Sequence, residues 1–245
     1  MELSIAEQFY LIALCDDTGK LLVEREDVNV ALGAGVLMEL IIAGRLKVVL
    51  GRLFILDEEQ NAPINPTQQA VLDFIEQHFI ADNLRPTMAL VLKAIRTHGL
   101  PHVKYNKVKL TSIVEQRLLE KKELTKESNF FSADKLWNRD STHEKSICEV
   151  LRAMVLRDTP PEPESLCLLH LVETFDLLHL LFSDSEIIDH SDRLEALFED
   201  SELTQVISNV LSLAELEAVR SAASSTASIS IAASTVAIST IVLSN

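Results

Sequence analysis

The chain has 245 residues, of which 47% are hydrophobic, and it contains only 6 glycines and 7 prolines. This length suits one large domain or two small ones, and the scarcity of turn-forming residues favours helices over a many-stranded β fold. The 37 acidic residues outnumber the 22 basic ones and give a net charge of -15, which argues against a general affinity for nucleic acid or anionic lipid. Any contact with a phosphate group must therefore be local.

The cysteines and the opening residues indicate the compartment. Cys15, Cys148 and Cys167 are an odd number of cysteines, far apart and in apolar surroundings, which favours reduced thiols over a disulfide framework. The opening residues include Glu2 and lack the basic region of a signal peptide. We therefore expect a cytoplasmic protein.

Apolar residues at helical spacing predict a series of helices in the first half of the chain. The first, residues 4–14, opens with Ser4 and Glu7 in the arrangement of a capping box. The second, residues 28–43, is apolar on almost every side, ends at Gly44, and should form a central buried helix. Further helices are predicted at residues 67–81, 87–96 and 108–122.

Alternation of apolar and polar residues predicts two β-hairpins. One covers residues 45–56, with Gly51 and Arg52 between its strands. The other covers residues 124–137, with its tip near residues 132–134. The connecting segments are a turn at 16–19, a short extended piece at 20–23, and loops at 57–66 and 98–106.

Two further helices are predicted at residues 146–156 and 165–182, because the prolines between them cannot continue a helix. An amphipathic pair of helices, or one broken helix, follows at residues 192–213. The expected fold is therefore mainly α, with a compact helical domain around a central hydrophobic bundle and one or two small β-hairpins.

The last residues of the chain differ from the rest, because residues 221–245 contain no charged side chain. We expect a domain at residues 1–220 and a separate tail at residues 221–245. The tail is about as long as a helix that crosses a bilayer, but its many hydroxyl groups make it a poor insertion signal. A helix packed on the domain, a disordered segment and a weak membrane anchor remain as alternatives.

Several strings of residues occur in a characteristic order. They are Leu3-Ser-Ile-Ala-Glu-Gln, Leu11-Ile-Ala-Leu, Asp16-Asp-Thr-Gly, Val36-Leu-Met-Glu-Leu-Ile-Ile-Ala-Gly-Arg-Leu, Arg117-Leu-Leu-Glu-Lys-Lys-Glu-Leu, Leu156-Arg-Asp-Thr-Pro and Leu168-Leu-His-Leu. In this order and spacing they resemble the Golgi phosphoprotein 3 family over residues 3–220. None of the strings is a catalytic signature.

The resemblance implies a compact helical domain with a protruding hairpin for self-association and a basic pocket for phosphatidylinositol 4-phosphate. Eukaryotic members of the family adapt membrane cargo at the Golgi. The resemblance thus implies a peripheral membrane-associating adaptor on the cytoplasmic face of a membrane, which binds lipid and protein partners and is not an enzyme. The alternative is a cytosolic oligomeric interaction scaffold without lipid binding.

The residues that bind the lipid headgroup in the family are missing from this chain. Glu24 stands where the resemblance implies a membrane-dipping tryptophan, and Gly33 where it implies an arginine. Val108 and Thr111 stand where it implies two more arginines. Phosphate recognition needs convergent positive donors, so the usual pocket is not expected.

Other basic residues fall in the same two regions of the sequence. Arg25, Lys104, Lys107 and Lys109 are the candidates for a substitute headgroup cluster that binds phosphoinositide or another anionic lipid. The alternative is that these side chains belong to two unrelated solvated faces, because exposed lysines are common.

The second hairpin carries candidates for self-association. Phe130 and Phe131 are neighbours that would point to opposite faces of a strand, and Trp137 lies near the hairpin's end. These residues predict a homo-oligomer through the hairpin. For Trp137, a place at a membrane interface and packing of the hairpin against the body of the protein remain as alternatives.

Signatures of catalysis and metal binding are absent from the sequence. It contains no Gly-x-Ser-x-Gly elbow, phosphate-binding glycine loop or HExxH motif, so we expect no enzyme and no cofactor. Cys167 and His170 have the spacing of two metal ligands on a helix, but no second pair accompanies them. We expect both to pack in the core.

Overall fold

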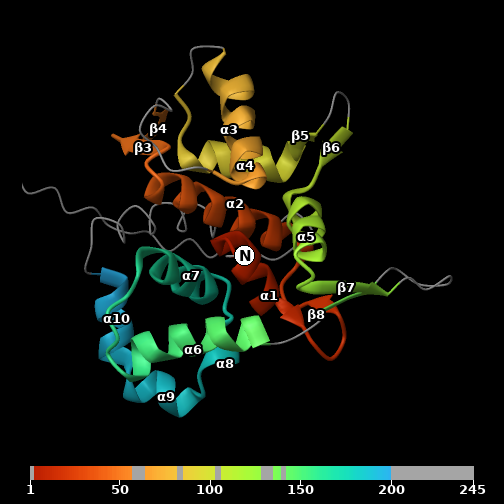
Figure 1. Cartoon of the computed structure of the whole chain (residues 1–245). Helices are drawn as coiled ribbons and strands as arrows, with labels where there is room; N and C mark the ends of the chain where they lie inside the picture. The colour runs from red at the N-terminus through yellow and green to blue at the C-terminus, as the bar shows by residue number, and fades with distance from the viewer. Residues whose placement is uncertain are drawn as a thin grey trace, which may run out of the picture.

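The computed structural model describes residues 3–56, 64–81, 85–102, 106–127, 135–138 and 142–199. Helices form most of this part of the chain, and its strands occur only in two-stranded antiparallel sheets (Figure 1). The predicted mainly α fold is therefore confirmed. None of the helices in the described part is both long and apolar enough to cross a membrane.

The elements follow one another in a simple series. The helices are α1 (Ile5–Ile12), α2 (Arg25–Ile42), α3 (Pro66–Ile75), α4 (Met88–His98), α5 (Leu110–Glu120), α6 (Thr142–Leu156), α7 (Pro163–Thr174), α8 (Leu178–Leu181), α9 (Asp184–Asp189) and α10 (Ser191–Glu199), with a π-helical segment η2 (Glu76–Ile80) after α3. The paired strands are β1 (Leu14–Cys15) with β2 (Lys20–Leu21), β3 (Leu46–Val49) with β4 (Arg52–Ile55), β5 (Leu100–His102) with β6 (Asn106–Val108), and β7 (Leu124–Glu127) with β8 (Lys135–Asn138).

Helix α2 is the centre of the fold, as its apolar sequence predicts. It contacts α1, α3, α4, α5 and α7, and Figure 1 shows it lying between α4 and α7. Every residue from Val28 to Leu40 is buried. At Gly33 a Cβ atom would lie 3.0 Å from Cδ2 of Leu92, so α4 packs closely on α2 at this point.

Helix α1 begins with the predicted capping box. The Ser4 hydroxyl accepts a hydrogen bond from the Glu7 backbone N–H at 3.3 Å, and the Glu7 carboxylate accepts one from the Ser4 N–H at 2.8 Å. These bonds satisfy two backbone donors that the first turn of a helix leaves unpaired. The side chain of Glu7 is therefore fixed at the buried start of α1.

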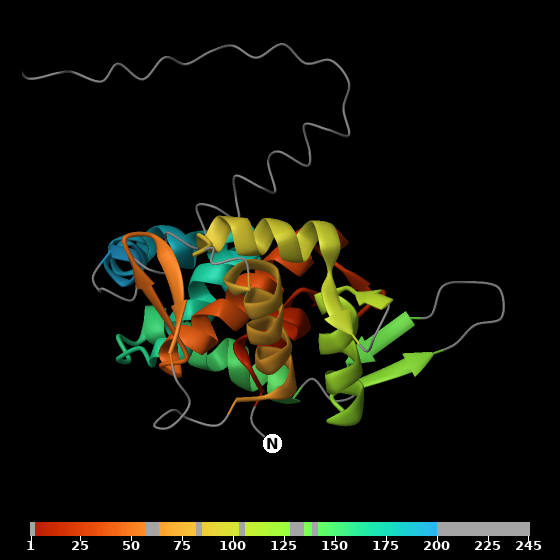
Figure 2. The ribbon, with the colours of Figure 1, turned by 90° about the horizontal axis from the view of Figure 1, so that it is seen from above.

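The predicted hairpins at 45–56 and 124–137 are present as β3–β4 and β7–β8. The strands of β7–β8 project from the helical body in both ribbon views (Figure 1 and Figure 2). Its predicted tip at 132–134 lies outside the described residues. The loop prediction for 98–106 is wrong, because Gly99 at φ 65° ends α4 and turns the chain into β5, which pairs with β6.

The predicted helix at 165–182 is also wrong in its length. Helix α7 ends at Thr174, Asp176 adopts a left-handed φ of 57°, and α8 begins two residues later. The break between α7 and α8 directs the side chain of Leu177 into the core. The run of leucines in this segment does not predict where the helix breaks. Helix α9 was not predicted, α10 accounts for the start of the predicted segment 192–213, and the tail at 221–245 lies outside the described residues.

The predicted helix at 67–81 changes its winding halfway. Its first part is α3, and the wider π-helical turns of η2 follow. The ring of Phe79 then packs edge-on against that of Phe74, with 6.2 Å between the ring centres. The extra residue in the turn thus brings Phe79 into the core.

Candidate functional site

Two members of the predicted headgroup cluster, Arg25 and Lys109, lie where the first turns of α2 and α5 come together. Arg25 on α2 forms an ion pair of 2.8 Å with Glu115 on α5. Lys109, just before α5, lies 3.9 Å from Glu26 on α2. The two regions are thus neighbours in space. Lys104 lies outside the described residues, and Lys107 belongs to strand β6 directly before α5.

Carboxylates accompany the basic groups in this cluster. Glu115 also accepts a hydrogen bond from the Tyr10 hydroxyl at 2.9 Å. Burial raises the pKa of Asp27, which follows Glu26 in the first turn of α2. An arriving phosphate group would therefore compete with acidic side chains for Arg25 and Lys109.

Two positions where the resemblance implies headgroup-binding arginines, Gly33 and Thr111, are buried in this structure. Gly33 faces Leu92 of α4. Thr111 is fully buried, and its backbone N–H donates to the Asn29 side chain at 3.0 Å. An arginine at either position would displace packed neighbours. Neither position offers a positive donor for a phosphate group, and the substitute cluster stays a prediction.

A polar cavity of about 770 Å³ opens at the junction of α1, α2, α3, α5 and α7. Its floor and rim combine apolar and charged side chains from segments far apart in the sequence. The lining residues are Leu3, Ser4, Ile5, Glu7, Gln8, Glu39, Ile42, Ala43, Asn65, Gln68, Arg117, Lys121, Glu162, Glu164 and Ser165. This volume is in the range of small-molecule and side-chain binding pockets.

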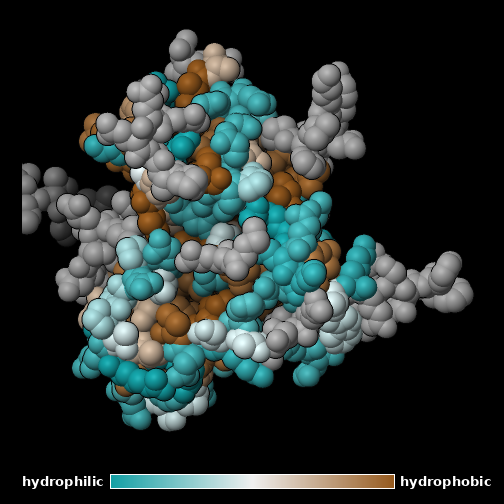
Figure 3. Space-filling model, viewed as in Figure 1, coloured by the Kyte–Doolittle hydropathy of each residue, from teal (hydrophilic) through white to brown (hydrophobic). Residues whose placement is uncertain are grey.

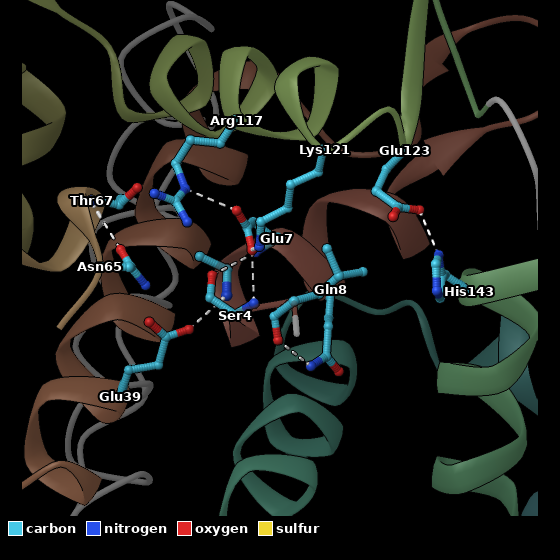
Figure 4. Close-up of polar contacts among 12 residues, drawn as sticks. Ser4, Glu7, Gln8, Glu39, Asn65, Thr67, Arg117, Lys121, Glu123 and His143 are labelled. Atoms are coloured by element: carbon cyan, nitrogen blue, oxygen red, sulfur yellow. Dashed lines mark hydrogen bonds and ion pairs between the residues drawn. The ribbon is translucent and has the colours of Figure 1, made fainter. Parts of the chain in front are cut away.

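Glu7 lies at one wall of this cavity, between Arg117 of α5 and Lys121, which directly follows α5 (Figure 4). Its carboxylate accepts hydrogen bonds from Nε of Arg117 at 2.9 Å and from Nζ of Lys121 at 2.6 Å. Burial acts to raise the pKa of Glu7, but the hydrogen bonds from Lys121, the Ser4 backbone and Arg117 outweigh it and lower the pKa. Glu7 is thus a charged and fully engaged group.

Glu39 lies at the opposite wall, on the central helix α2. The Gln68 side-chain amide donates to its carboxylate at 2.7 Å, and the Ala6 backbone N–H donates at 3.2 Å. Both donors are neutral, and within the described residues Glu39 forms no ion pair. Burial raises the pKa of Glu39, and the nearby Glu7 adds to this effect. The site therefore has one buried carboxyl group without a counter-charge.

The cavity has the chemistry of a binding site for a cation. Its described lining contains four carboxyl groups, from Glu7, Glu39, Glu162 and Glu164, against the two cations Arg117 and Lys121. None of the described lining residues is a cysteine or a histidine. Because Glu7 already engages both cations, Glu39 is the group that a positively charged ligand would neutralise.

The sequence interpretation missed this cavity, although one signal pointed to it. Glu39 is the only charged residue in the apolar stretch 28–43, and a carboxyl group on an all-round buried helix needs a partner. Its neighbours Gln68, Arg117 and Lys121 come from distant parts of the chain. Their convergence on Glu39 and Glu7 cannot be read from local sequence patterns.

Trp137 is half-buried on β8, opposite Thr125 of β7, whereas Phe130 and Phe131 lie outside the described residues. Self-association through this hairpin stays a prediction. Cys167 and His170 are buried in the core, as expected, and the ring of His170 lies 4.5 Å from that of Phe198, measured between centres.

Comparison with known proteins agrees with the resemblance seen in the sequence. A search of curated proteins finds no match to this chain. The model of the family described as Golgi phosphoprotein 3 (GPP34) matches residues 5–225, which include every helix and strand described above. The chain therefore belongs to the Golgi phosphoprotein 3 family.

Proposed function

We propose that the chain is a peripheral membrane-associating adaptor, which holds a partner at a membrane surface without catalysing a reaction on it. Membership of the Golgi phosphoprotein 3 family supports this function. The observation that carries the adaptor role is the uncompensated carboxyl group of Glu39 in the polar cavity. The ligand that this cavity favours is a lysine or arginine side chain in an extended segment of the partner.

The electrostatics of the cavity support a cationic ligand. A buried carboxylate without a counter-charge costs stability, because its desolvation is not offset. A guanidinium or ammonium group next to Glu39 would supply the missing charge and favour the ionised carboxylate. Glu162 and Glu164 at the start of α7 are exposed and would attract the same group on its approach.

The same groups argue against catalysis in the cavity. A general base or nucleophile needs a reactive lone pair, whereas the lone pairs of Glu7 already accept hydrogen bonds from Arg117, Lys121 and the Ser4 backbone. The Ser4 hydroxyl accepts from the Glu7 N–H as part of the capping box and has no base beside it among the described contacts. A binding role suits these groups better than an acid–base role.

A peptide titration tests the adaptor role. Isothermal calorimetry at low salt compares a capped peptide of alternating arginine and glycine with the same peptide carrying citrulline in place of arginine. We expect the arginine peptide alone to bind, and Glu39→Gln to weaken it by about tenfold or more, since hydrogen bonds between charged groups are lost. The matched control Glu26→Gln removes an exposed carboxylate outside the cavity and should leave binding unchanged.

Two outcomes would overturn this role. Equal binding of both peptides would mean that the cavity does not recognise positive charge. Equal weakening by Glu39→Gln and Glu26→Gln would mean that the peptide only follows the overall negative charge of the chain.

Flotation with vesicles tests the membrane part of the proposal. Vesicles contain phosphatidylcholine alone, phosphatidylcholine with phosphatidylserine, or phosphatidylcholine with phosphatidylinositol 4-phosphate. We expect the protein to float with at least one of the two anionic compositions at low salt. If it stays in the soluble fraction with every composition, the membrane role is wrong and the cytosolic interaction scaffold takes its place.

A further inference from the structure

The β3–β4 hairpin differs in charge from the rest of the chain. Residues 45–56 contain Arg45, Lys47 and Arg52 and no acidic residue, in a protein whose net charge is -15. A fourth cation lies beside them, because the guanidinium group of Arg85 stands 5.4 Å from the centre of the Phe54 ring. Arg45 is buried, so the exposed positive charge at the hairpin comes from Lys47, Arg52 and the adjacent Arg85.

The register of the hairpin separates its two faces. Directly opposed residues of an antiparallel pair point to the same side. Leu46 pairs with Ile55 and Val48 with Leu53, and this face packs on the core. The other face carries two further opposed pairs, Lys47 with Phe54 and Val49 with Arg52. Cations therefore alternate with apolar side chains on the outward face.

The tip of the hairpin carries an exposed leucine in an unfavourable conformation. Leu50 is 97% exposed, and its φ is 50°, in the left-handed region. Gly51 follows with a φ of 71°, so the tip has the backbone of a two-residue turn for which Asn-Gly is the favoured sequence. Leu50 is unfavourable at this position for two reasons. A left-handed backbone conformation is strained for a residue with a Cβ atom, and its apolar side chain is exposed to water. An environment that buries the Leu50 side chain would remove the cost of its exposure to water.

We propose that the β3–β4 hairpin is a membrane-contact element that inserts Leu50 into the interface of an anionic bilayer. In this arrangement Lys47, Arg52 and Arg85 contact lipid phosphate groups, and Val49 lies at the level of the headgroups. Figure 1 shows β3 and β4 at the edge of the molecule, and Figure 3 shows hydrophobic beside hydrophilic surface there. The proposal rests on the membrane association proposed above.

This element is separate from the predicted headgroup cluster. The cluster lies at the first turn of α2, and the hairpin follows the last turn, so the 18-residue helix separates them. At 1.5 Å per residue the helix spans about 27 Å. The hairpin can therefore be tested independently of Arg25 and Lys109.

A bilayer suits the hairpin better than a second protein surface. The exposed apolar side chains of the hairpin are Leu50, Val49 at 40% and Leu56 at 37%, whereas stable protein interfaces use about 20–30 residues a side. Positive and apolar side chains side by side, with no acidic residue among them, match the negative phosphates and hydrocarbon of a lipid interface.

The test compares single substitutions in the full chain. Flotation uses vesicles of phosphatidylcholine, with and without phosphatidylserine. Leu50→Asn removes the apolar tip but keeps a residue that favours the turn, so it should melt at or above the wild-type temperature. We expect it to lower the bound fraction about tenfold at equal lipid, because the gain from burying a leucine is lost.

Two further variants complete the design. The matched control is Ile188→Gln on α9, which removes a side chain that is 72% exposed elsewhere on the protein and should leave flotation unchanged. Lys47→Gln should lower binding to the phosphatidylserine vesicles about fivefold, since it removes one cation near an anionic surface.

The outcomes separate this inference from the proposed function. Flotation of Leu50→Asn at the wild-type level overturns the hairpin proposal and leaves membrane association standing. Failure of the wild-type protein to float with any vesicle removes both. If Leu50→Asn changes the oligomeric state measured by light scattering and not the flotation, the tip contacts a second copy and the bilayer proposal is wrong.

Discussion

The ion pairs of Glu7 are buried, and we therefore expect their loss to lower the free energy of unfolding strongly. Glu7 is 1% exposed and Lys121 7%, and their charged atoms lie 2.6 Å apart. The substitution Glu7→Gln removes the negative charge and leaves Lys121 and Arg117 without their shared counter-charge. Breaking a buried pair in this way costs about 3–5 kcal/mol of the free energy of unfolding. For a chain of this size, the melting temperature should fall by roughly 6–20 °C.

The chain offers a matched control with the same distance and a different environment. Arg157 and Glu149 are also 2.6 Å apart, but their side chains are 68% and 55% exposed. Glu149→Gln should therefore cost less than about 0.5 kcal/mol. Urea denaturation followed by circular dichroism measures both variants at neutral pH. Equal losses of unfolding free energy in Glu7→Gln and Glu149→Gln would refute the reasoning. The contribution of an ion pair to stability would then depend on its distance and not on its burial.

The pH dependence of the Glu7 contribution has a definite sign. The pKa of Glu7 in the folded protein is lowered from 4.5, so the folded state binds its proton less readily than the unfolded chain. The stabilisation is present above pH 4.5 and is lost as the pH falls through the folded-state pKa. The difference between wild type and Glu7→Gln should therefore shrink in acid. A constant difference would contradict the ionic origin of the effect.

Three further predictions concern other buried or basic groups. Burial lowers the pKa of His170 from 6.5 to about 4, so folding should lose up to about 3 kcal/mol as the pH falls from 6.5 to 4, and His170→Leu should show a smaller loss in urea titrations. Burial raises the pKa of Glu39, so Glu39→Gln should gain stability relative to wild type as the pH rises from 4.5 through the folded-state pKa, with a constant difference above it in the same assay. If the predicted headgroup cluster binds lipid, replacing Lys107 and Lys109 together by glutamate should abolish flotation with phosphatidylinositol 4-phosphate vesicles without lowering the melting temperature. Unchanged flotation would show that Lys107 and Lys109 do not bind the lipid headgroup.

The local sequence determined much of the secondary structure of this protein. The capping box of Ser4 and Glu7, the buried helix around Gly33 and the hairpin at 45–56 all depend on residues within a few positions of one another. Such patterns act through the periods of the helix and the strand, which a single segment carries by itself. The order of short strings was also enough to indicate the family.

The tertiary structure alone decided where the chain bends and which charges meet. The break at Asp176 and the turn at Gly99 depend on how the next segment packs against the core, and the leucines around the break are compatible with either outcome. Glu7 meets Lys121 across 114 positions of sequence. A charge in isolation has no preferred partner, so only the packing of α5 against α1 determines which carboxyl groups are neutralised. For the same reason, only the packing leaves the buried Glu39 without an ion pair among the described residues.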